Sequence, residues 1–227
     1  QGGLFGINSL EWIRPTPDVA PQLLFGTKLG GLFYVPAASD ESAPHAAKVH
    51  VTGPDGIALR HPAVGTNMVA YPTADGLRTD LIAAGEGGMY YYRFTGRNGT
   101  RGEPVFEQPR SVRQESAELY SGSLIVPNVV DFDGDGHLDI VAGNAAGELL
   151  LFRNRGTNAA PRFLPAEPIT AGGEPVLIRG AYRGSIQGPG EAHWGYTCPM
   201  VVDWNQDGLS DIVMNDIRGM HTVYLNR

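Results

Sequence analysis

The chain of 227 residues has little cysteine, little lysine and no long apolar run. Its single cysteine, Cys198, cannot form an internal disulfide, and we expect a buried thiol there. Because no run of 18 apolar residues is present, no membrane-spanning helix is expected. The chain also has no basic tract and no excess of Lys and Arg, so we expect no nucleic-acid partner.

Glycine and proline, in contrast, are abundant, with 31 and 17 residues. No stretch is rich in strong helix formers, and the hydrophobic content of 42% is enough for a sizeable core. This composition predicts an all-β fold in which many short strands are joined by turns.

The formal net charge of -7 comes from two loops, DFDGDGHLD at residues 131–139 and DWNQDGLSD at residues 203–211. Together they contain seven carboxylates, and the other 17 acidic residues are equal in number to the 17 basic ones. The acidity is therefore concentrated in two places and is not spread over the surface.

The first loop has the spacing of a cation site, because oxygen atoms at its alternate positions can converge on one point. The predicted ligands are Asp131, Asp133, Asp135, the backbone carbonyl of His137, and Asp139. Ca²⁺ takes six to eight such oxygens in irregular geometry, whereas zinc and copper prefer other ligands. A solvated acidic turn between strands is the alternative. An EF-hand is disfavoured because an apolar strand, and not a helix, follows the loop.

The second loop repeats this spacing 72 residues later. Its predicted ligands are Asp203, Asn205, Asp207, the backbone carbonyl of Leu209, and Asp211. Asn205 keeps an oxygen ligand but removes one charge, so we expect weaker calcium binding there. Two loops with equal internal spacing favour a pair of calcium sites over an accidental acidic turn.

A pattern of an apolar strand, a turn and a second strand occurs four times in the chain. Each of the two acidic loops precedes one copy. The copies are DIVAGNAAGELLLFRN from Asp139, DIVMNDIRGMHTVYLN from Asp211, DLIAAGEGGMYYYRF from Asp80 and QLLFGTKLGGLFYV from Gln22. A further piece, GTxxxPxF, recurs at residues 99–106 and 156–163 and predicts an edge strand. The chain thus contains four units of three or four antiparallel strands, the size of a propeller blade.

Particular positions in these units carry further expectations. Gly26, Gly85, Gly143 and Asn215 share a turn position where we expect positive φ. In the copy before Asp80, only Asp75 and Asp80 remain, and they would hold Ca²⁺ poorly. The copy before Gln22 has only Asp18 and is expected to bind none. In MYYYRF, Tyr90 and Tyr92 share one strand face, and core packing is their expected role.

These residues resemble the FG-GAP or VCBS repeats of integrin-alpha-type β-propellers and of many secreted bacterial proteins. The resemblance is carried by VDFDGDGHLDIVAGN with LLLFRNRGTNAAPRF, and by VVDWNQDGLSDIV with TVYLNR. It implies a β-propeller of four-stranded antiparallel blades with Ca²⁺ in both loops, and it assigns no reaction.

Propellers of this family usually have about seven blades, so the four blades visible here are expected to form part of a larger propeller. A closed four-bladed ring is the alternative. We expect one β-propeller domain or segment over residues 1–227. The predicted blades cover approximately residues 8–60, 61–120, 121–185 and 186–227.

The spacing between the third and fourth units is longer by an insertion within Ile178–Pro199. Lengthened loops on a repeat scaffold often carry function. The ligand-binding candidates are Tyr182, Arg183, His193, Trp194 and Tyr196. A polysaccharide lyase must neutralise a uronate carboxylate and move a proton, and Arg183, His193 and Tyr196 are candidate catalytic residues for this chemistry. A glycan-binding surface, or simple packing at the end of a blade, is the alternative.

The sequence therefore predicts a calcium-stabilised extracellular β-propeller module that binds or scaffolds a carbohydrate or protein. The alternative is a polysaccharide lyase or another carbohydrate-active enzyme acting on acidic glycans. Two structural Ca²⁺ ions are expected, and calcium is most abundant outside the cytosol, which favours a secreted, periplasmic or cell-surface location. Further blades from a longer chain or from another copy are additional expected partners.

Overall fold

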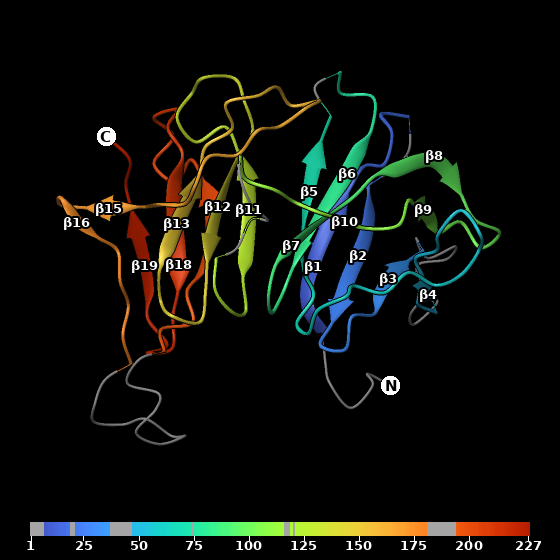
Figure 1. Cartoon of the computed structure of the whole chain (residues 1–227), viewed down its shortest axis with the longest axis horizontal. Helices are drawn as coiled ribbons and strands as arrows, with labels where there is room; N and C mark the ends of the chain where they lie inside the picture. The colour runs from blue at the N-terminus through green and yellow to red at the C-terminus, as the bar shows by residue number, and fades with distance from the viewer. Residues whose placement is uncertain are drawn as a thin grey trace. The chain divides into compact units, whose positions relative to one another are not determined.

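Strands form all the regular structure of the computed structural model, which describes residues 7–18, 21–36, 47–73, 75–115, 119, 121–180 and 194–227 (Figure 1). Within these ranges no helix is present, and so none has the length and apolar character that a membrane span requires. The all-β class predicted from the glycine and proline content is confirmed.

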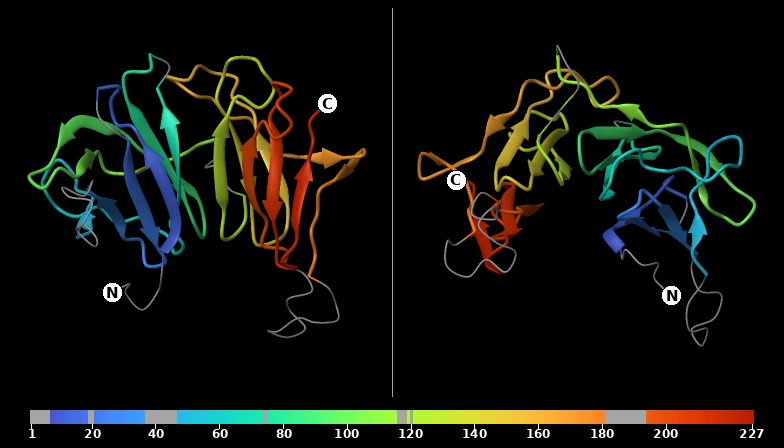
Figure 2. Two further views of the ribbon diagram at one scale, coloured as in Figure 1. Left: turned by 180° about the vertical axis from the view of Figure 1, so that it is seen from behind. Right: turned by 60° about the horizontal axis from the view of Figure 1, so that its bottom comes forward.

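Four small antiparallel sheets are the blades of a β-propeller fold (Figures 1 and 2). Blade 1 consists of β1 (Ile7–Ile13), β2 (Gln22–Thr27), β3 (Leu32–Val35) and β4 (Val49–His50). Blade 2 consists of β5 (Asn67–Pro72), β6 (Thr79–Ala84), β7 (Met89–Tyr92) and β10 (Arg110–Ser111). Blade 3 consists of β11 (Val126–Val130), β12 (Asp139–Gly143), β13 (Leu149–Phe152) and β14 (Glu167–Pro168). Blade 4 consists of β17 (Cys198–Val202), β18 (Asp211–Asn215) and β19 (His221–Tyr224).

The GTxxxPxF segments form hairpins outside the four strands of a blade. In blade 2, β8 (Phe94–Asn98) pairs with β9 (Pro104–Phe106), and the fourth strand, β10, follows this hairpin. The amide of Gly99 donates to the carbonyl of Glu103 over 2.7 Å, which turns the chain back onto β8. The expected turn and edge strand are thus confirmed for residues 99–106, but the strand pairs with β8 and is not one of the four strands of the blade. The remaining hairpin pairs β15 (Thr170–Ala171) with β16 (Glu174–Pro175).

The chain divides into two compact units, one of residues 1–85 and 89–112 and the other of residues 86–88 and 113–227. Blades 1 and 2 lie in the first unit, and blades 3 and 4 lie in the second. The blade boundaries expected from the sequence stay a prediction.

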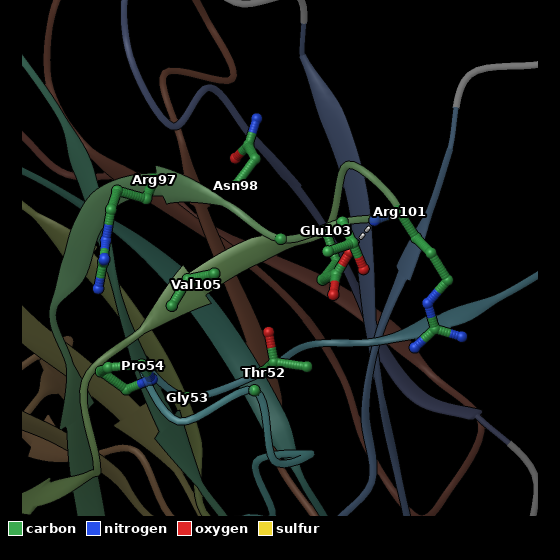
Figure 3. A pocket seen from close by; sticks show the side chains of 11 residues that line it. Thr52, Gly53, Pro54, Arg97, Asn98, Arg101, Glu103 and Val105 are labelled. Atoms are coloured by element: carbon green, nitrogen blue, oxygen red, sulfur yellow. Dashed lines mark hydrogen bonds between the residues drawn. The ribbon is translucent and has the colours of Figure 1, made fainter.

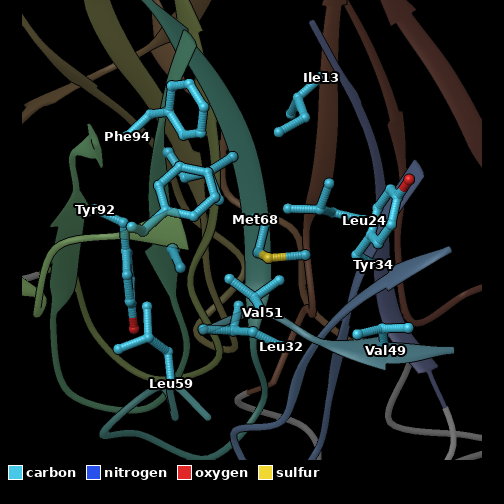
Figure 4. Close-up of a cluster of buried hydrophobic side chains, with 13 residues drawn as sticks. Ile13, Leu24, Leu32, Tyr34, Val49, Val51, Leu59, Met68, Tyr92 and Phe94 are labelled. Atoms are coloured by element: carbon cyan, nitrogen blue, oxygen red, sulfur yellow. The ribbon is translucent and has the colours of Figure 1, made fainter. Parts of the chain in front are cut away.

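The core of the first unit lies between blade 1 and blade 2 (Figure 4). Leu24 and Leu32 of blade 1 pack there with Leu81 and Tyr92 of blade 2. Tyr90 is partly buried against the same cluster, which confirms the expected core packing of Tyr90 and Tyr92. Burial of these side chains is the main favourable contribution to joining the two sheets.

The core of the second unit is built in the same way from blade 3 and blade 4. Val141 and Leu151 of blade 3 pack with Ile212 and Met214 of blade 4. The opposite face of β17 is not covered in this way. Cys198 lies there and is exposed, so the expectation of a buried thiol is wrong.

Small residues are needed where one blade approaches the next. The reason is the close approach of the backbone and not the expected positive φ. Gly26, Gly85, Gly143 and Asn215 do not have positive φ; that conformation occurs instead at later turn glycines such as Gly147, with a φ of 80°. A Cβ atom on Gly143 would lie 2.3 Å from the backbone oxygen of Thr197, and one on Gly26 would lie 2.3 Å from that of Thr66. Close approach of the next blade therefore selects glycine there.

We predict that Gly143→Ala lowers the free energy of unfolding by about 1–3 kcal/mol, because the added methyl group must displace the backbone of blade 4. Urea denaturation measures the change. Asn215→Ala is the matched control at the equivalent, exposed position of blade 4, and its effect should stay within about 0.5 kcal/mol. Equal losses in the two variants would contradict the role of close approach.

His61 is a buried histidine in the first unit. Its Nδ1 atom lies 3.1 Å from the hydroxyl of Tyr92, and its ring packs edge-on against Tyr90 with 5.3 Å between the ring centroids. Burial lowers the pKa of His61 from 6.5 to about 4. The folded protein therefore holds this ring neutral at pH values where the unfolded chain protonates it.

Below pH 6.5 only the unfolded chain gains this proton, so the free energy of unfolding should fall between about pH 6.5 and pH 4. The loss attributable to His61 is roughly 3 kcal/mol. His61→Gln should flatten this part of the stability profile, measured by urea denaturation at several pH values. A His61→Gln profile as steep as that of the unaltered protein would refute the assignment.

Candidate metal site

The loop between β11 and β12 is folded by its own carboxylates. Asp131 accepts backbone hydrogen bonds from Gly134 over 2.8 Å and from Gly136 over 2.9 Å. Both glycines have positive φ, at 77° and 87°, a conformation that glycine adopts without strain. Asp135 accepts a bond from the amide of His137 over 2.9 Å. The chain thus winds around the Asp131 side chain.

Asp139 ties the end of this loop to the sheet. Its carboxylate is buried and accepts backbone N–H bonds from Phe132 over 3.2 Å and from Asn154 over 2.8 Å. Burial raises the pKa of Asp139, and the charges of Asp133 and Asp135 add to this effect. A buried carboxylate beside two other carboxylates is unfavourable unless a positive charge lies close to it.

Three of the predicted ligands are brought together. Asp131, Asp133 and Asp139 each offer a carboxylate oxygen, and these oxygens all lie within 4.8 Å of one another. Asp135 is not part of this group, and its Oδ2 atom lies 3.8 Å from Nδ1 of His137. Whether the carbonyl of His137 is a ligand stays a prediction.

The donor set fits Ca²⁺. It consists of carboxylate oxygens on a loop that carries further backbone carbonyls, and it contains no thiolate or imidazole pair that would favour zinc or copper. Arg153 forms an ion pair with Asp133 and lies 3.3 Å from Glu167, so one guanidinium group already offsets part of the negative charge. The remaining charge of the loop is what a divalent cation would neutralise.

The second loop, between β17 and β18, repeats the hydrogen bonds of the first, except that Asp203 accepts the amide four residues later where Asp131 accepts the amide three residues later. Asp203 accepts bonds from the amides of Asp207 over 3.0 Å and Gly208 over 2.9 Å. Asp211 is buried and accepts bonds from the amides of Trp204 and Asn226, over 2.9 and 2.8 Å. The two loops therefore share one fold at the 72-residue offset.

The two loops differ in one pair of charges. Asn205 replaces Asp133, and Leu225 replaces Arg153, the cation that pairs with Asp133. An anion and its cation are lost together, so the difference in net charge between the loops is small. The expected weaker calcium binding of the second loop stays a prediction, and it now depends on the change of ligand from carboxylate to amide.

Blade 2 neutralises the equivalent aspartate with its own side chains. Asp80 is buried and accepts the amide of Phe94 over 2.8 Å, as Asp139 accepts that of Asn154. The Nε atom of Arg78 lies 3.0 Å from Oδ1 of Asp80, and the hydroxyl of Tyr91 donates to Oδ2. An arginine therefore supplies the positive charge here, which gives a physical reason for the expected loss of calcium binding.

Arg78→Met should leave a buried charge without its partner and lower the free energy of unfolding by about 3 kcal/mol. Adding Asp80→Asn should recover most of this loss, because the double variant has no charge to neutralise. Arg93→Met, which breaks an exposed pair with Glu107, is the control and should cost less than about 1 kcal/mol. If Arg78→Met and Arg93→Met had equal effects in urea denaturation, Arg78 would not be the internal cation.

The insertion between blades 3 and 4 is described only in part. Of its candidate ligand-binding residues, Tyr182, Arg183 and His193 lie outside the described residues. Trp194 and Tyr196 are described, and their rings meet edge to face with centroids 5.6 Å apart. The catalytic grouping of Arg183, His193 and Tyr196 therefore stays a prediction.

Two cavities contain residues that sequence reasoning did not select. One, of about 280 Å³, lies in the first unit, where β8, β9 and the turn after Thr52 meet, and its lining includes Arg97 and Glu103 (Figure 3). The other, of about 220 Å³, lies in the second unit beside both acidic loops, and its lining includes Arg153 and Tyr224. No spacing in the sequence marks either cavity, because each is lined by segments far apart in the chain.

The repeat was compared with known proteins. A family model described as FG-GAP-like repeat matches residues 131–214. Searches of the curated proteins and of the solved structures found no match. The matched residues begin at the first acidic loop and end within β18, so they include both loops of the candidate site. Residues 131–214 are thus similar to an FG-GAP-like repeat, which confirms the predicted resemblance to the FG-GAP/VCBS family.

Proposed function

We propose that this protein is a calcium-stabilised β-propeller module that binds or scaffolds a carbohydrate or protein ligand outside the cytosol. The observation that carries the proposal is the group of three carboxylates within 4.8 Å, located in the FG-GAP-like repeat. A propeller of such repeats supports a binding or scaffold role, and no reaction follows from it.

Calcium would be a structural component of the fold. In the first loop it would be held by Asp131, Asp133, Asp135, Asp139 and the carbonyl of His137. In the second it would be held by Asp203, Asn205, Asp207, Asp211 and the carbonyl of Leu209. The ion would supply the positive charge that allows the carboxylates to lie together. A calcium ion that binds only to the folded loop stabilises the folded protein by about 2.7 kcal/mol when the calcium concentration is a hundredfold above its Kd.

The proposed location outside the cytosol is supported by the kind of site. Flexible loops in extracellular modules bind calcium with dissociation constants of about 10⁻⁴ to 10⁻³ M, and such sites fill only where calcium is abundant. A secreted, periplasmic or cell-surface protein meets this condition.

The ligand class is supported by the cavity beside the loops. Arg153 and Glu167 offer charged hydrogen-bonding groups there, and Tyr224 offers an aromatic ring. At about 220 Å³ the cavity has room for one sugar residue or one peptide side chain, and it is smaller than the usual site of a drug-sized molecule. Trp194 and Tyr196 are a second aromatic surface for a sugar.

Binding is preferred to catalysis because no described residues support the lyase alternative. Two of its three candidate catalytic residues, Arg183 and His193, lie outside the described residues. A lyase therefore has no geometric observation in its favour.

Removal of calcium with EDTA should lower the thermal unfolding midpoint by several degrees, because each filled site adds stability. The combined variant Asp131→Asn with Asp133→Asn should lose most of this calcium dependence, and Asp203→Asn should lose a smaller part. Asp75→Asn, in the degenerate loop of blade 2, is the matched control and should retain the full dependence. Differential scanning calorimetry measures the unfolding midpoint, and isothermal titration calorimetry measures the binding of calcium.

An unfolding midpoint that does not change between millimolar calcium and excess EDTA would disprove the structural role. The proposal of a carbohydrate or protein ligand is tested separately. A protein that is stable without calcium and still binds a glycan would contradict only the calcium assignment.

A further inference from the structure

The cavity in the first unit contains two buried polar side chains whose hydrogen-bonding capacity the fold leaves partly unused. This cavity, of about 280 Å³, lies between the turn after Thr52 and the β8–β9 hairpin (Figure 3). Glu103 and Thr52 both line it, and they are only 3% and 5% exposed. Buried polar groups normally have partners, so each of these two side chains requires an explanation.

The carboxylate of Glu103 has no cation beside it. Its Oε2 atom accepts the backbone amide of Arg101 over 2.9 Å, whereas Oε1 accepts no hydrogen bond from any described residue. A Cβ atom on Gly99 would lie 2.3 Å from Oε1, so a glycine is what allows the carboxylate to occupy this position. A buried carboxylate with an unused oxygen is unfavourable for the fold by itself. It is therefore an acceptor that a ligand can use.

Thr52 offers a second unused group in the same cavity. Its hydroxyl forms no hydrogen bond within the described part of the chain, and Figure 3 shows it pointing toward the space between Val105 and Glu103. The backbone of Thr52 is held in place, because its carbonyl accepts the amide of Phe106 over 3.1 Å and the residue pairs with Val105 in a parallel bridge. A hydroxyl and a carboxylate are thus presented from rigid backbone, as a binding site requires.

The charges that line the cavity favour an anionic ligand. Arg97 and Arg101 lie on either side of Glu103 in the view of Figure 3. Both arginines are exposed, and neither forms an ion pair with another described residue. Two guanidinium groups and one carboxylate leave the lining with a net charge of +1. A monoanion balances this charge, whereas two guanidinium groups repel an amine and a zwitterion leaves the charge unbalanced.

We propose that this cavity binds one residue of an acidic sugar of the uronic acid class. The sugar hydroxyls donate to Glu103 and bond with Thr52, and the sugar carboxylate pairs with Arg97 or Arg101, since guanidinium groups match the geometry of a carboxylate. Val105 contacts the ring carbons. The inference rests on the proposed function only for the carbohydrate class of the ligand. It assigns a different site, in the unit that does not contain the acidic loops.

Two-dimensional amide NMR spectra of the nitrogen-labelled protein test the site. Glucuronate should shift the amide signals of Gly53, Gly56 and residues 97–103, which border the cavity. Methyl glucoside keeps the hydroxyls without the carboxylate, and propionate keeps a carboxylate without the hydroxyls. Each of these two probes should bind at least about tenfold more weakly than glucuronate, because each lacks one set of charged hydrogen bonds.

Variants separate the roles of the two kinds of charge. Arg97→Gln combined with Arg101→Gln should weaken the binding of glucuronate about tenfold and leave methyl glucoside unchanged. Glu103→Gln should weaken both sugars about tenfold, because an amide replaces the charged acceptor of their hydroxyls. Arg14→Gln removes an exposed arginine outside the cavity and is the matched control, which should bind as the unaltered protein does.

The stability of the ligand-free protein gives a readout that a structural role would not give. Glu103→Gln and Thr52→Val should each leave the thermal unfolding midpoint unchanged or raise it, because each reduces the buried polar capacity that has no partner. A fall of several degrees in either variant would show that the group serves the fold, and it would overturn the proposal.

Other outcomes of the NMR titration would also overturn the site. Equal binding of glucuronate and propionate would indicate an adventitious anion only. Shifts confined to the surroundings of Arg153 and Tyr224 would support the cavity beside the acidic loops, and so the proposed function, but not this site. If the shifts of residues 97–103 persist in excess EDTA while the unfolding midpoint does not depend on calcium, the calcium assignment alone fails and the acidic-sugar site stands.

Discussion

A buried aspartate at the start of the second strand is the constraint on which three of the four blades depend. Asp80, Asp139 and Asp211 each accept a backbone amide from the chain 14 or 15 residues later, and so each fixes the end of its third strand. A buried carboxylate is stable only beside a positive charge. Blade 1 needs no positive charge there, because the equivalent residue is the neutral Gln22, which pairs with β1. Blade 2 meets this requirement with Arg78, and blade 3 brings Asp131, Asp133 and Asp139 together in a loop suited to a metal ion. Blade 4 has a loop of similar fold around Asp203.

This constraint connects the repeat to its proposed setting. With the proposed calcium sites, the arginine in place of an ion would make blade 2 independent of calcium, whereas the aspartate-rich loops would make the second unit depend on it. The two units would then respond differently to calcium removal, the second losing stability and the first retaining it. Such a division is consistent with the FG-GAP-like match, which begins at the first acidic loop and covers none of blades 1 and 2.

Much of this organisation was predictable from the sequence, because repeats reveal equivalent positions. The all-β class, the blades and the convergence of Asp131, Asp133 and Asp139 follow from alternation and spacing. Other features depend on contacts between distant segments, which spacing does not encode. The role of Gly143 depends on how closely Thr197 approaches it, and the pairing of Arg78 with Asp80 depends on a side-chain orientation. Likewise, the sequence pattern does not show that β9 pairs with β8 in a separate hairpin and not with a strand of the blade.

Departures from a repeat are as informative as the repeat itself. Where blade 1 meets blade 2 and where blade 3 meets blade 4, a glycine (Gly26 or Gly143) lies against the next backbone, and Glu11 or Asn128 accepts a backbone amide. Blade 4 has Asn215 and Met200 at these positions while keeping valines at the apolar ones. Blade 4 thus keeps the apolar positions of the repeat and changes its small and polar ones, as the residues at 200, 213, 215 and 223 show.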